Sequence, residues 1–515
     1  MPTINESLLD SRLGKLESTR NWSPRVISKL EAFVRTADDY DLFRVDPIQY
    51  ATEKGMAENE AIDLFLHASK GNIFDLEWSL ICNCCGQSFA SFRGLGNLHA
   101  HFVCNFCLME NNAELDDMIK VSFTVAPAIR EIIYHTPVKL SAEDYMFKYC
   151  MTRGLTRGPD GVNNTEYFRK CCNAIQYLEP GEKWKLELDV SPGFLYCGDL
   201  LRGVPLSFIV YAATDQAPPP VRIIFGLPDM QVAEPETEAR ALTIVAHGVT
   251  KNFELSYYKE IPAGRSQWEL ENRLAERACV VIMNIPSNVT ETWPQIPPFL
   301  TGKRLLTTQT FRDLYRSEVI EDNEGLGVRD ITFLFTDLKG STALYDKLGD
   351  LKAYHLVREH FDALNEVIIK NSGAIVKTIG DAIMATFCTP IDGIRAAIEI
   401  LNAIDKFNED RTEQLILKIG LHAGHSIAVT LNERLDYFGQ TVNIASRVQE
   451  LAGANEIFIS KEVYNYPEVG NILEHYMITP SQVTVRGVSG TLQLYKINSH
   501  SNEVKVGHSL ENQSQ

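Results

Sequence analysis

The part of the sequence that decides the fold is residues 331–387, ITFLFTDLKGSTALYDKLGDLKAYHLVREHFDALNEVIIKNSGAIVKTIGDAIMATF. Residues 331–335 form an apolar run of the length expected for a buried strand. A helix should follow, because apolar residues recur there at helical spacing up to a stop at Ser372 and Gly373. The apolar stripe of this helix consists of Leu344, Leu348, Leu351, Val357, Phe361, Leu364 and Ile368.

Two further strand-like runs, residues 374–379 and 382–387, are separated only by Gly380 and Asp381, which predicts a tight hairpin. A second amphipathic helix near residues 394–407 and a strand at 415–421 come next. The order strand, helix, hairpin, helix, strand is typical of the ferredoxin-like arrangement, an open sheet with helices on one face. The sequence therefore predicts an α/β (α+β) domain in this region.

The whole chain is long, acidic and ordinary in composition. Its 515 residues predict about three domains. The 67 acidic residues against 49 basic ones disfavour binding to nucleic acid or to an anionic membrane surface. No apolar run approaches the roughly 18 residues that a membrane span needs, and the amino terminus lacks the pattern of a signal peptide. We therefore expect a cytoplasmic protein with mostly reduced cysteines.

Turn residues and changes of pattern divide the chain into seven segments. They are a polar tail (1–22), a helical, winged-helix-like module (23–80), a zinc-ribbon-like element (81–120), a β-rich, mostly antiparallel regulatory domain (121–308), a helical linker (309–328), the α/β domain (329–497) and a disordered tail (498–515).

The helical module carries three helix-like apolar patterns, and their order resembles a winged helix. Residues 21–80 contain eleven acidic and six basic residues, which argues against DNA binding. A structural or dimerising role is the better interpretation.

Two C-x2-C pairs, Cys82 with Cys85 and Cys104 with Cys107, have the spacing of a four-thiolate zinc site. Such a site leaves no open coordination position, so we expect structural zinc rather than a catalyst. The alternative is reduced, metal-free packing cysteines, with Cys84, His99 or His101 as substitute ligands. The remaining cysteines show no metal spacing and are expected to be buried thiols.

Two carboxylates of the α/β domain occupy strand ends. Asp337 follows the first strand, and Gly340, Ser341 and Thr342 then begin the helix, where free backbone N–H groups can receive phosphate. Asp381 lies at the tip of the hairpin. Two such acids would suit two metal ions that bridge a triphosphate. Taken alone, Asp337 would indicate a helix cap and Asp381 a turn residue.

Two further motifs are KTIGD, residues 377–381, and LDYFGQTVNIASR, residues 435–447. Asn443 and Arg447 in the second motif are four apart and share one helix face, which alone would indicate only an exposed polar pair. Together and in this order, the motifs resemble the class III nucleotidyl cyclases, the family of adenylate and guanylate cyclases. The resemblance covers residues 329–497, and the TFRDLY helix at 310–315 and the cysteine region also look like an extension of bacterial cyclases.

The resemblance implies roles for individual residues. It implies two Mg²⁺ or Mn²⁺ ions on Asp337 and Asp381, with help from the Leu338 carbonyl. It also implies that Asn443 orients the ribose and that Arg447 neutralises charge on the α-phosphate. Arg486 lies near the place where the family often has a cation that binds phosphate.

Base choice is assigned by the resemblance to Lys377 and Asp436. Adenine offers an acceptor at N1 and donors on its 6-amino group, which a Lys donor and an Asp acceptor complement. Guanine reverses this edge, so ATP is the expected substrate. In this family the metal acids come from one subunit and the other residues from its partner. One chain with both sets therefore suggests a homodimer.

The resemblance makes the chain an adenylate cyclase that forms cyclic AMP and pyrophosphate, with residues 1–320 regulatory. One alternative is a cyclase for GTP or a pyrimidine nucleotide. Another is a catalytically silent protein that senses ATP. The sequence names no activating signal, so the regulatory ligand or protein is unknown.

Overall fold

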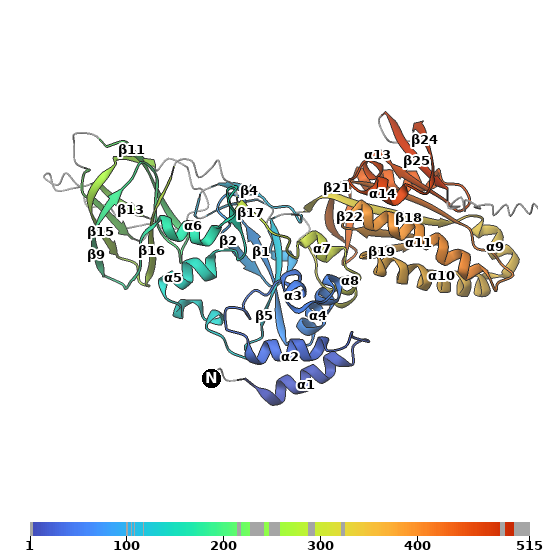
Figure 1. Cartoon of the computed structure of the whole chain (residues 1–515), viewed down its shortest axis with the longest axis horizontal. Coiled ribbons are helices and arrows are strands. Elements are labelled where there is room, and N and C mark those ends of the chain that lie inside the picture. Colours follow the sequence, from blue (N-terminus) through green and yellow to red (C-terminus); the bar gives the residue numbers. More distant parts are fainter. Residues whose placement is uncertain are drawn as a thin grey trace, which may run out of the picture. The chain divides into compact units, whose positions relative to one another are not determined.

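The computed structural model describes residues 4–98, 101–104, 106–107, 109–116, 118–213, 218–226, 242–246, 258–286, 294–320, 325–484 and 490–498. The chain forms two compact units (Figure 1). The first consists of Met1–Arg93, His99–Ala113 and Asp117–Leu300, and the second of Gly94–Leu98, Glu114–Asp116 and Thr301–Gln515. Each unit is described by itself.

The first unit begins with helices that pack near a small sheet. The helices are α1 (Glu6–Glu17), α2 (Val26–Thr36), α3 (Pro47–Lys54) and α4 (Glu58–Lys70). The sheet has the order β2-β1-β5, with β1 at Phe74–Ile81, β2 at Ser88–Phe92 and β5 at Ile119–Val125. Val45, between α2 and α3, forms an isolated bridge to Phe123 of β5. The order helix, bridge, helix, helix, strand, strand resembles that of a winged helix, but it is not confined to the predicted residues 23–80, because β2 and β5 lie beyond them.

The cysteine segment is inserted between β1 and β5, which are antiparallel neighbours. The predicted boundary at residue 120 is therefore wrong, because it separates two strands of one sheet. The predicted polar tail is also wrong for α1, whose Leu9, Leu13 and Leu16 are buried. These leucines recur at helical spacing, a signal that the charged residues around them masked.

The β-rich region is a sandwich of two sheets. One sheet has the order β14-β11-β10-β16-β8 and the other β13-β12-β15-β9. Buried residues of both sheets form one core, in which the rings of Phe208 and Trp268 meet edge to face with centroids 5.4 Å apart. The strands are β8 (Cys172–Leu178), β9 (Lys183–Val190), β10 (Gly193–Asp199), β11 (Val204–Tyr211), β12 (Val221–Phe225), β13 (Leu242–Ala246), β14 (Tyr258–Pro262), β15 (Gly264–Asn272) and β16 (Ala278–Ile285).

The sandwich corrects two expectations for residues 121–308. It begins only at β8, since shorter elements occupy the stretch after β5. It is also mixed rather than mostly antiparallel, because β14 pairs with β11 in parallel and β12 does so with both β13 and β15. The shorter elements of this unit are β3 (His101–Val103), β4 (Glu110–Asn112), η2 (Ile133–His135), η3 (Pro137–Lys139), α5 (Ala142–Asp144), η4 (Tyr145–Cys150), β6 (Thr156–Arg157), β7 (Val162–Asn163), α6 (Asn164–Cys171) and β17 (Pro294–Gln295).

The second unit is built on a sheet with the order β19-β20-β18-β21-β23-β25-β24, and β22 pairs with β21. Its first four strands in space, β19-β20-β18-β21, have the predicted ferredoxin-like order. Helices α10 and α11 lie along this sheet (Figure 1) and supply apolar residues to the core. The strands are β18 (Leu326–Leu338), β19 (Gly373–Ile379), β20 (Ala382–Phe387), β21 (Leu417–Leu431), β22 (Arg434–Phe438), β23 (Glu456–Ser460), β24 (Met477–Thr484) and β25 (Thr491–Asn498).

The helices of this unit begin before the sheet. They are η1 (Leu95–Asn97), α7 (Gly302–Leu306), α8 (Gln309–Leu314), α9 (Ser341–Leu348), α10 (Asp350–Lys370), α11 (Pro390–Asn408), α12 (Gln440–Glu450), α13 (Lys461–Tyr464) and α14 (Val469–Leu473). The single helix predicted after β18 is in fact two, α9 and α10, because Gly349 between them has a φ of 76°.

Helix α12 packs directly on β21. A Cβ atom at Gly420 of β21 would lie 2.2 Å from the backbone nitrogen of Gln449 in α12, so only glycine allows this approach. The close contact fixes which face of α12 is buried. Ile444, Ala445 and Val448 lie on that face. The described part of the chain contains no helix long and apolar enough to cross a membrane.

Candidate functional site

Two carboxylates lie on neighbouring strands of the second unit. Asp337 is the penultimate residue of β18, and Asp381 lies in the two-residue turn that joins β19 to β20. Strands β18 and β20 pair with Thr336 opposite Ile383, so the turn lies beside the end of β18. Both acids are half-buried. The Oδ2 atom of Asp381 is buried and has no hydrogen-bond partner among the described residues.

The two acids repel each other. Burial raises the pKa of Asp337 above its usual value of 3.8, and the neighbouring Asp381 raises it further. Two neighbouring carboxyl groups, one of which has an unpartnered oxygen, suit a hard divalent cation, because the positive charge would relieve their repulsion. The donor set therefore fits Mg²⁺ or Mn²⁺.

The loop after Asp337 leads into α9 and borders a pocket of about 180 Å³. Leu338, Lys339, Gly340 and Ser341 line one side of this pocket. Gly340 has a φ of 78°, a conformation that favours glycine, and α9 begins at the next residue. Thr342 is exposed in the first turn of α9. The start of this helix thus presents backbone N–H groups as the sequence predicted.

Lys377 of β19 and Asp436 of β22 form an ion pair, with 2.5 Å between Nζ and Oδ2. Asp436 is nearly buried, and its Oδ1 accepts a hydrogen bond of 2.8 Å from the Tyr437 backbone N–H. The Lys377 side chain is more exposed. The structure therefore brings together the two residues to which the resemblance assigns base recognition.

Helix α8 ties both strands of this pair together. The Gln309 side chain accepts a hydrogen bond of 2.8 Å from the backbone N–H of Ile375 in β19. The Arg312 guanidinium donates one of 2.7 Å to the backbone carbonyl of Leu435 in β22. This role of Gln309 and Arg312 could not be predicted from the sequence, because a contact between residues so far apart leaves no local pattern.

Asn443 and Arg447 lie on the exposed face of α12, opposite the face that packs on β21. Arg447 forms an ion pair with Glu450, one turn further along the helix. Within the described residues, neither side chain is hydrogen-bonded to the paired acids or to the pair of Lys377 and Asp436. One chain by itself therefore presents Asn443 and Arg447 to solvent.

Other predicted and unpredicted residues complete this region. Leu338 is buried at the end of β18, and Arg486 lies outside the described residues, as does the predicted tail after residue 498.

His360 of α10 was not predicted. It is fully buried, which lowers the pKa of its imidazole, and its Nε2 has no hydrogen-bond partner among the described residues. A lone histidine on an amphipathic helix carries no signal that would have singled it out.

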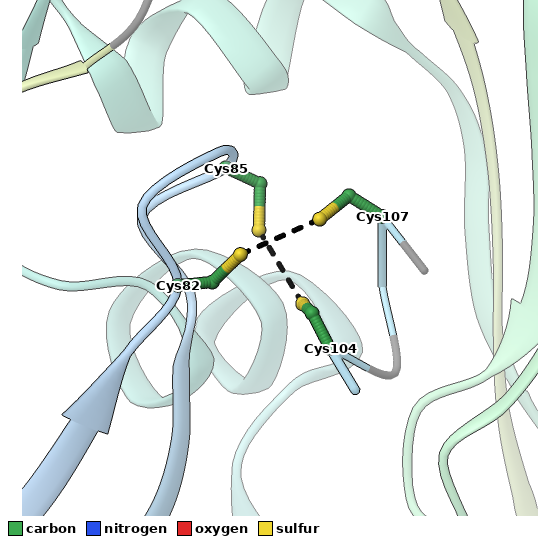
Figure 2. A group of neighbouring side chains, drawn as sticks. All are labelled: Cys82, Cys85, Cys104 and Cys107. Carbon is green, nitrogen blue, oxygen red and sulfur yellow. Dashed lines mark hydrogen bonds between the residues drawn. The ribbon is translucent and has the colours of Figure 1, made fainter. Parts of the chain in front are cut away.

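The first unit contains the predicted cysteine cluster. Figure 2 shows the sulfur atoms of Cys82, Cys85, Cys104 and Cys107 pointing toward one common centre. All lie within 4.8 Å of one another, with 3.4 Å between Cys82 and Cys107 and 3.6 Å between Cys85 and Cys104. Four sulfurs at about 2.3 Å from a tetrahedral zinc ion would be about 3.8 Å apart, so the donor set fits zinc.

The surroundings of the cluster hold the cysteines in place. Gly86 follows the first pair, and its backbone N–H donates to the Cys82 carbonyl at 2.8 Å with a φ of 75°. The Asn111 amide donates to the Cys82 sulfur at 3.6 Å. Cys84 is half-buried outside the group, His101 is exposed, and His99 lies outside the described residues.

The other cysteines form no such group in the described part of the chain. Cys150, Cys197 and Cys279 are buried, and burial raises the pKa of each thiol, which for Cys150 reaches about 12. The buried, unreactive thiols expected from the sequence are present at these three positions. The expectation of buried thiols is wrong for the other three, Cys171, Cys172 and Cys388, which are only half-buried.

Comparison with known proteins finds a family match for each of two stretches of the chain. Residues 10–200 match a family of unknown function (DUF5939), and residues 327–499 match the adenylate and guanylate cyclase catalytic domain. Residues 327–499 belong to the class III nucleotidyl cyclases.

Two relatives of this cyclase domain carry adenylate cyclase names. An adenylate cyclase of Anabaena cylindrica is 29% identical over 33% of this chain and 37% of its own length. Adenylate cyclase 2 of Rhizobium meliloti is 32% identical over 30% of this chain and 44% of its own length. The chain thus spans less than half of either relative. A crystal structure of an adenylyl cyclase from P. aeruginosa is 24% identical, with a TM-score of 0.30, over 35% of this chain and 99% of that one.

The cysteine cluster predicts that the purified protein contains zinc. Protein purified without chelator should contain about one zinc per chain, and Cys104→Ser should lose it, because three thiolates bind zinc more weakly than four. The measurement is elemental analysis by mass spectrometry. Cys171→Ser is the matched control in the same unit and should keep the metal. A wild-type protein that is folded but free of zinc would contradict the assignment.

The paired acids predict a dependence of stability on pH. Asp337→Asn should raise the thermal unfolding midpoint at pH 7 without divalent cations by roughly 2 °C, since a half-exposed charge contributes less than about 1 kcal/mol. Because the pKa of Asp337 is raised in the folded state, the contribution of this residue to stability falls as the pH rises above 3.8. The advantage of the variant should therefore shrink as the pH is lowered toward 3.8.

Asp346→Asn, at an exposed position on α9, is the control for this measurement and should leave the midpoint unchanged. Mn²⁺ should raise the midpoint of the wild type and have little effect on Asp337→Asn. An Asp337→Asn midpoint at or below the wild-type value at pH 7 would show that the two acids do not destabilise the fold.

Proposed function

We propose that this chain is an adenylate cyclase, which converts ATP into 3′,5′-cyclic AMP and pyrophosphate at the interface of a homodimer. The observation that carries the proposal is the ion pair of Lys377 and Asp436, which places one cationic donor beside one anionic acceptor. Adenine has an acceptor at N1 next to donors on its 6-amino group, so it matches both residues at once. Guanine would meet each of them with the wrong polarity, at a cost of about 1–3 kcal/mol per unpaired group.

The reaction joins the ribose 3′-oxygen to the α-phosphorus, breaks the bond from that phosphorus to the bridging oxygen of pyrophosphate, and releases the hydroxyl proton. Asp337, Asp381 and the Leu338 carbonyl would hold two Mg²⁺ or Mn²⁺ ions. When bound, such ions favour the ionised 3′-hydroxyl and offset the charge of the triphosphate. Cyclase domains generally use divalent metals, and the unpartnered oxygen of Asp381 supports their use in this chain.

Backbone N–H groups at Gly340, Ser341 and Thr342 would receive phosphate oxygens at the start of α9. Asn443 would hold the ribose. The Arg447 guanidinium would offset charge that develops on the α-phosphate, for which its planar fork of donors is suited. Its exposed ion pair with Glu450 is weak enough to be exchanged for a phosphate.

In a homodimer, Asn443 and Arg447 of one chain would complete the site that the paired acids form in the other chain. Asn443 and Arg447 face solvent, and four apolar side chains are exposed on β19, β21 and β22. Phe438 is 67% and Ile379 is 52% exposed, next to Gly439 and Gly380 of the two motifs. Exposed apolar surface of this kind is typical of subunit interfaces. The other two side chains are Ile427 and Leu431.

We also propose that the first unit, which carries the cysteine cluster and the sandwich, has a regulatory role. The cluster would be a structural zinc site, since its four thiolates leave no open coordination position.

The product identifies the substrate. Full-length protein given ATP, GTP, CTP or UTP separately with Mn²⁺ should form cyclic AMP from ATP, as measured by mass spectrometry. Asp381→Ala should lower the rate at least about 100-fold, because it removes a ligand from the charge-stabilising site. The control Asp346→Asn should retain the wild-type rate. Another cyclic nucleotide would overturn the base assignment, and no product from folded dimer would favour the catalytically silent alternative.

Base selection can be tested by exchanging the polarity of the recognising pair. The double variant Lys377→Glu with Asp436→Ser should change the ratio of ATP to GTP turnover by about 10- to 100-fold toward GTP, because it offers an acceptor to guanine N1 and a donor to O6. Steady-state rates with each nucleotide measure this ratio.

The matched control is Lys370→Glu with Glu399→Ser, which alters an ion pair between α10 and α11 in the same unit. This control should keep the wild-type ratio. An unchanged ratio in the Lys377 and Asp436 variant would mean that other residues read the base.

A further inference from the structure

The first unit contains a pocket of about 480 Å³ that none of the predicted sites uses. It opens between α2 and α3, where Phe33 and Tyr50 form part of its wall. A second pocket, of about 30 Å³, adjoins it and shares three lining side chains with it, those of Arg44, Lys120 and Arg153; we call this smaller pocket the inner end. The volume of the larger pocket lies within the range of small-molecule sites in proteins.

The inner end of the pocket rests on a polar face of the sheet of β1 and β5. Ser79 is paired with Lys120 and Glu77 with Ser122, so these four side chains lie on one face. The opposite face carries apolar residues such as Leu76 and Trp78, as the buried side of a sheet normally does. The polar face is buried nonetheless, since Ser79 is 3% and Ser122 is 1% exposed.

Four buried hydroxyl groups around the pocket have no hydrogen-bond partner among the described residues. Three border the inner end and belong to Ser79, Ser122 and Thr152, and the fourth belongs to Tyr50 in the outer part. An unsatisfied buried polar group costs about 1–3 kcal/mol. Four of them around two adjoining pockets indicate donors that are kept for a ligand.

The pocket is lined by twice as many cationic as acidic side chains. The cations are Lys29, Arg44, Lys54, Lys120, Lys148 and Arg153, and the acids are Asp41, Asp46 and Glu53. All the acids border the outer part.

Ion pairs hold the inner cations in place. Lys120 lies 3.1 Å from Asp46, and Arg44 lies 3.3 Å from Glu77. Arg44 also donates a hydrogen bond of 2.9 Å to the Tyr149 carbonyl, and its backbone has a φ of 50°, which is uncommon for residues other than glycine. The cationic groups are thus fixed beside the unpartnered hydroxyls.

The outer part offers a different surface. The rings of Phe33 and Tyr50 meet edge to face with centroids 5.1 Å apart, and the Lys54 ammonium lies 5.4 Å and 5.9 Å from their centroids. A flat or apolar group could pack against these rings. The pocket therefore has a polar, cationic end and an aromatic end.

We propose that this pocket binds a small organic phosphate, with the phosphate group among the inner hydroxyls and cations and the organic group against Phe33 and Tyr50. Phosphate oxygens accept several hydrogen bonds at once, which matches the number of donors at the inner end. Arg44 and Arg153 suit phosphate because their planar guanidinium groups present paired donors. The site is separate from the proposed cyclase site, since all its residues belong to the first unit.

The test is calorimetric titration of the full chain, without divalent cations, with phenyl phosphate, inorganic phosphate and phenol. Phenyl phosphate carries both chemical groups but no base that the cyclase site would read. It should bind saturably at about one per chain. Inorganic phosphate should bind about tenfold more weakly or worse, and phenol should give no saturable heat at the same concentration. Absence of saturable binding by phenyl phosphate would overturn the proposal.

A double variant, Ser79→Ala with Ser122→Ala, locates the binding. The thermal midpoint should stay unchanged or rise, because the two hydroxyls have no partner in the folded chain. Affinity for phenyl phosphate should fall about tenfold or more, since two hydrogen bonds to a charged group are lost.

Ser207→Ala is the matched control. It removes another buried hydroxyl without a partner, in β11 of the same unit and outside the pocket, and should keep the wild-type affinity. Equal affinities of the Ser79 and Ser122 variant and the wild type would place the binding elsewhere and overturn the proposal.

Discussion

Strand β18 is hydrogen-bonded along both edges, to β20 on one side and to β21 on the other. This double pairing is the constraint on which the second unit depends. It places Asp337 beside the hairpin turn with Asp381, and it extends β21 far enough to pair with β22, which carries Asp436. Helix α12 then packs on β21 through Gly420. Strand pairing thus determines the place of residues that are distant in sequence.

The same constraint forces charges into positions that folding alone would avoid. Two acids are held side by side, and one buried oxygen lacks a partner. Such local cost is typical of functional sites, where stability is lost in exchange for activity. The pair of Lys377 and Asp436 is different, because its two opposite charges form an ion pair within the chain. The two acids therefore lack the charge compensation that Lys377 and Asp436 give each other.

The sequence predicted those parts of the fold that local periodicity determines. The apolar run of β18, the two-residue turn at Gly380 and the helices around it follow from spacing alone. Contacts between distant segments could not be predicted. The hydrogen bond from Arg312 to Leu435 and the pairing of β1 with β5 depend on tertiary structure. The candidate site residues were predicted from the order of the motifs, since their spacing alone would have indicated helix caps, turn residues and an exposed polar pair.

The insertion between β1 and β5 also affects how the chain is made. A ribosome adds roughly 5–20 residues per second, so β5 emerges roughly 2–8 seconds after β1. During that time β2 is the first strand available to β1, and this local hairpin needs little loop closure. All four cysteines of the cluster appear within the same interval. The four cysteine sulfurs can therefore come together before β5 pairs with β1 and completes the three-stranded sheet.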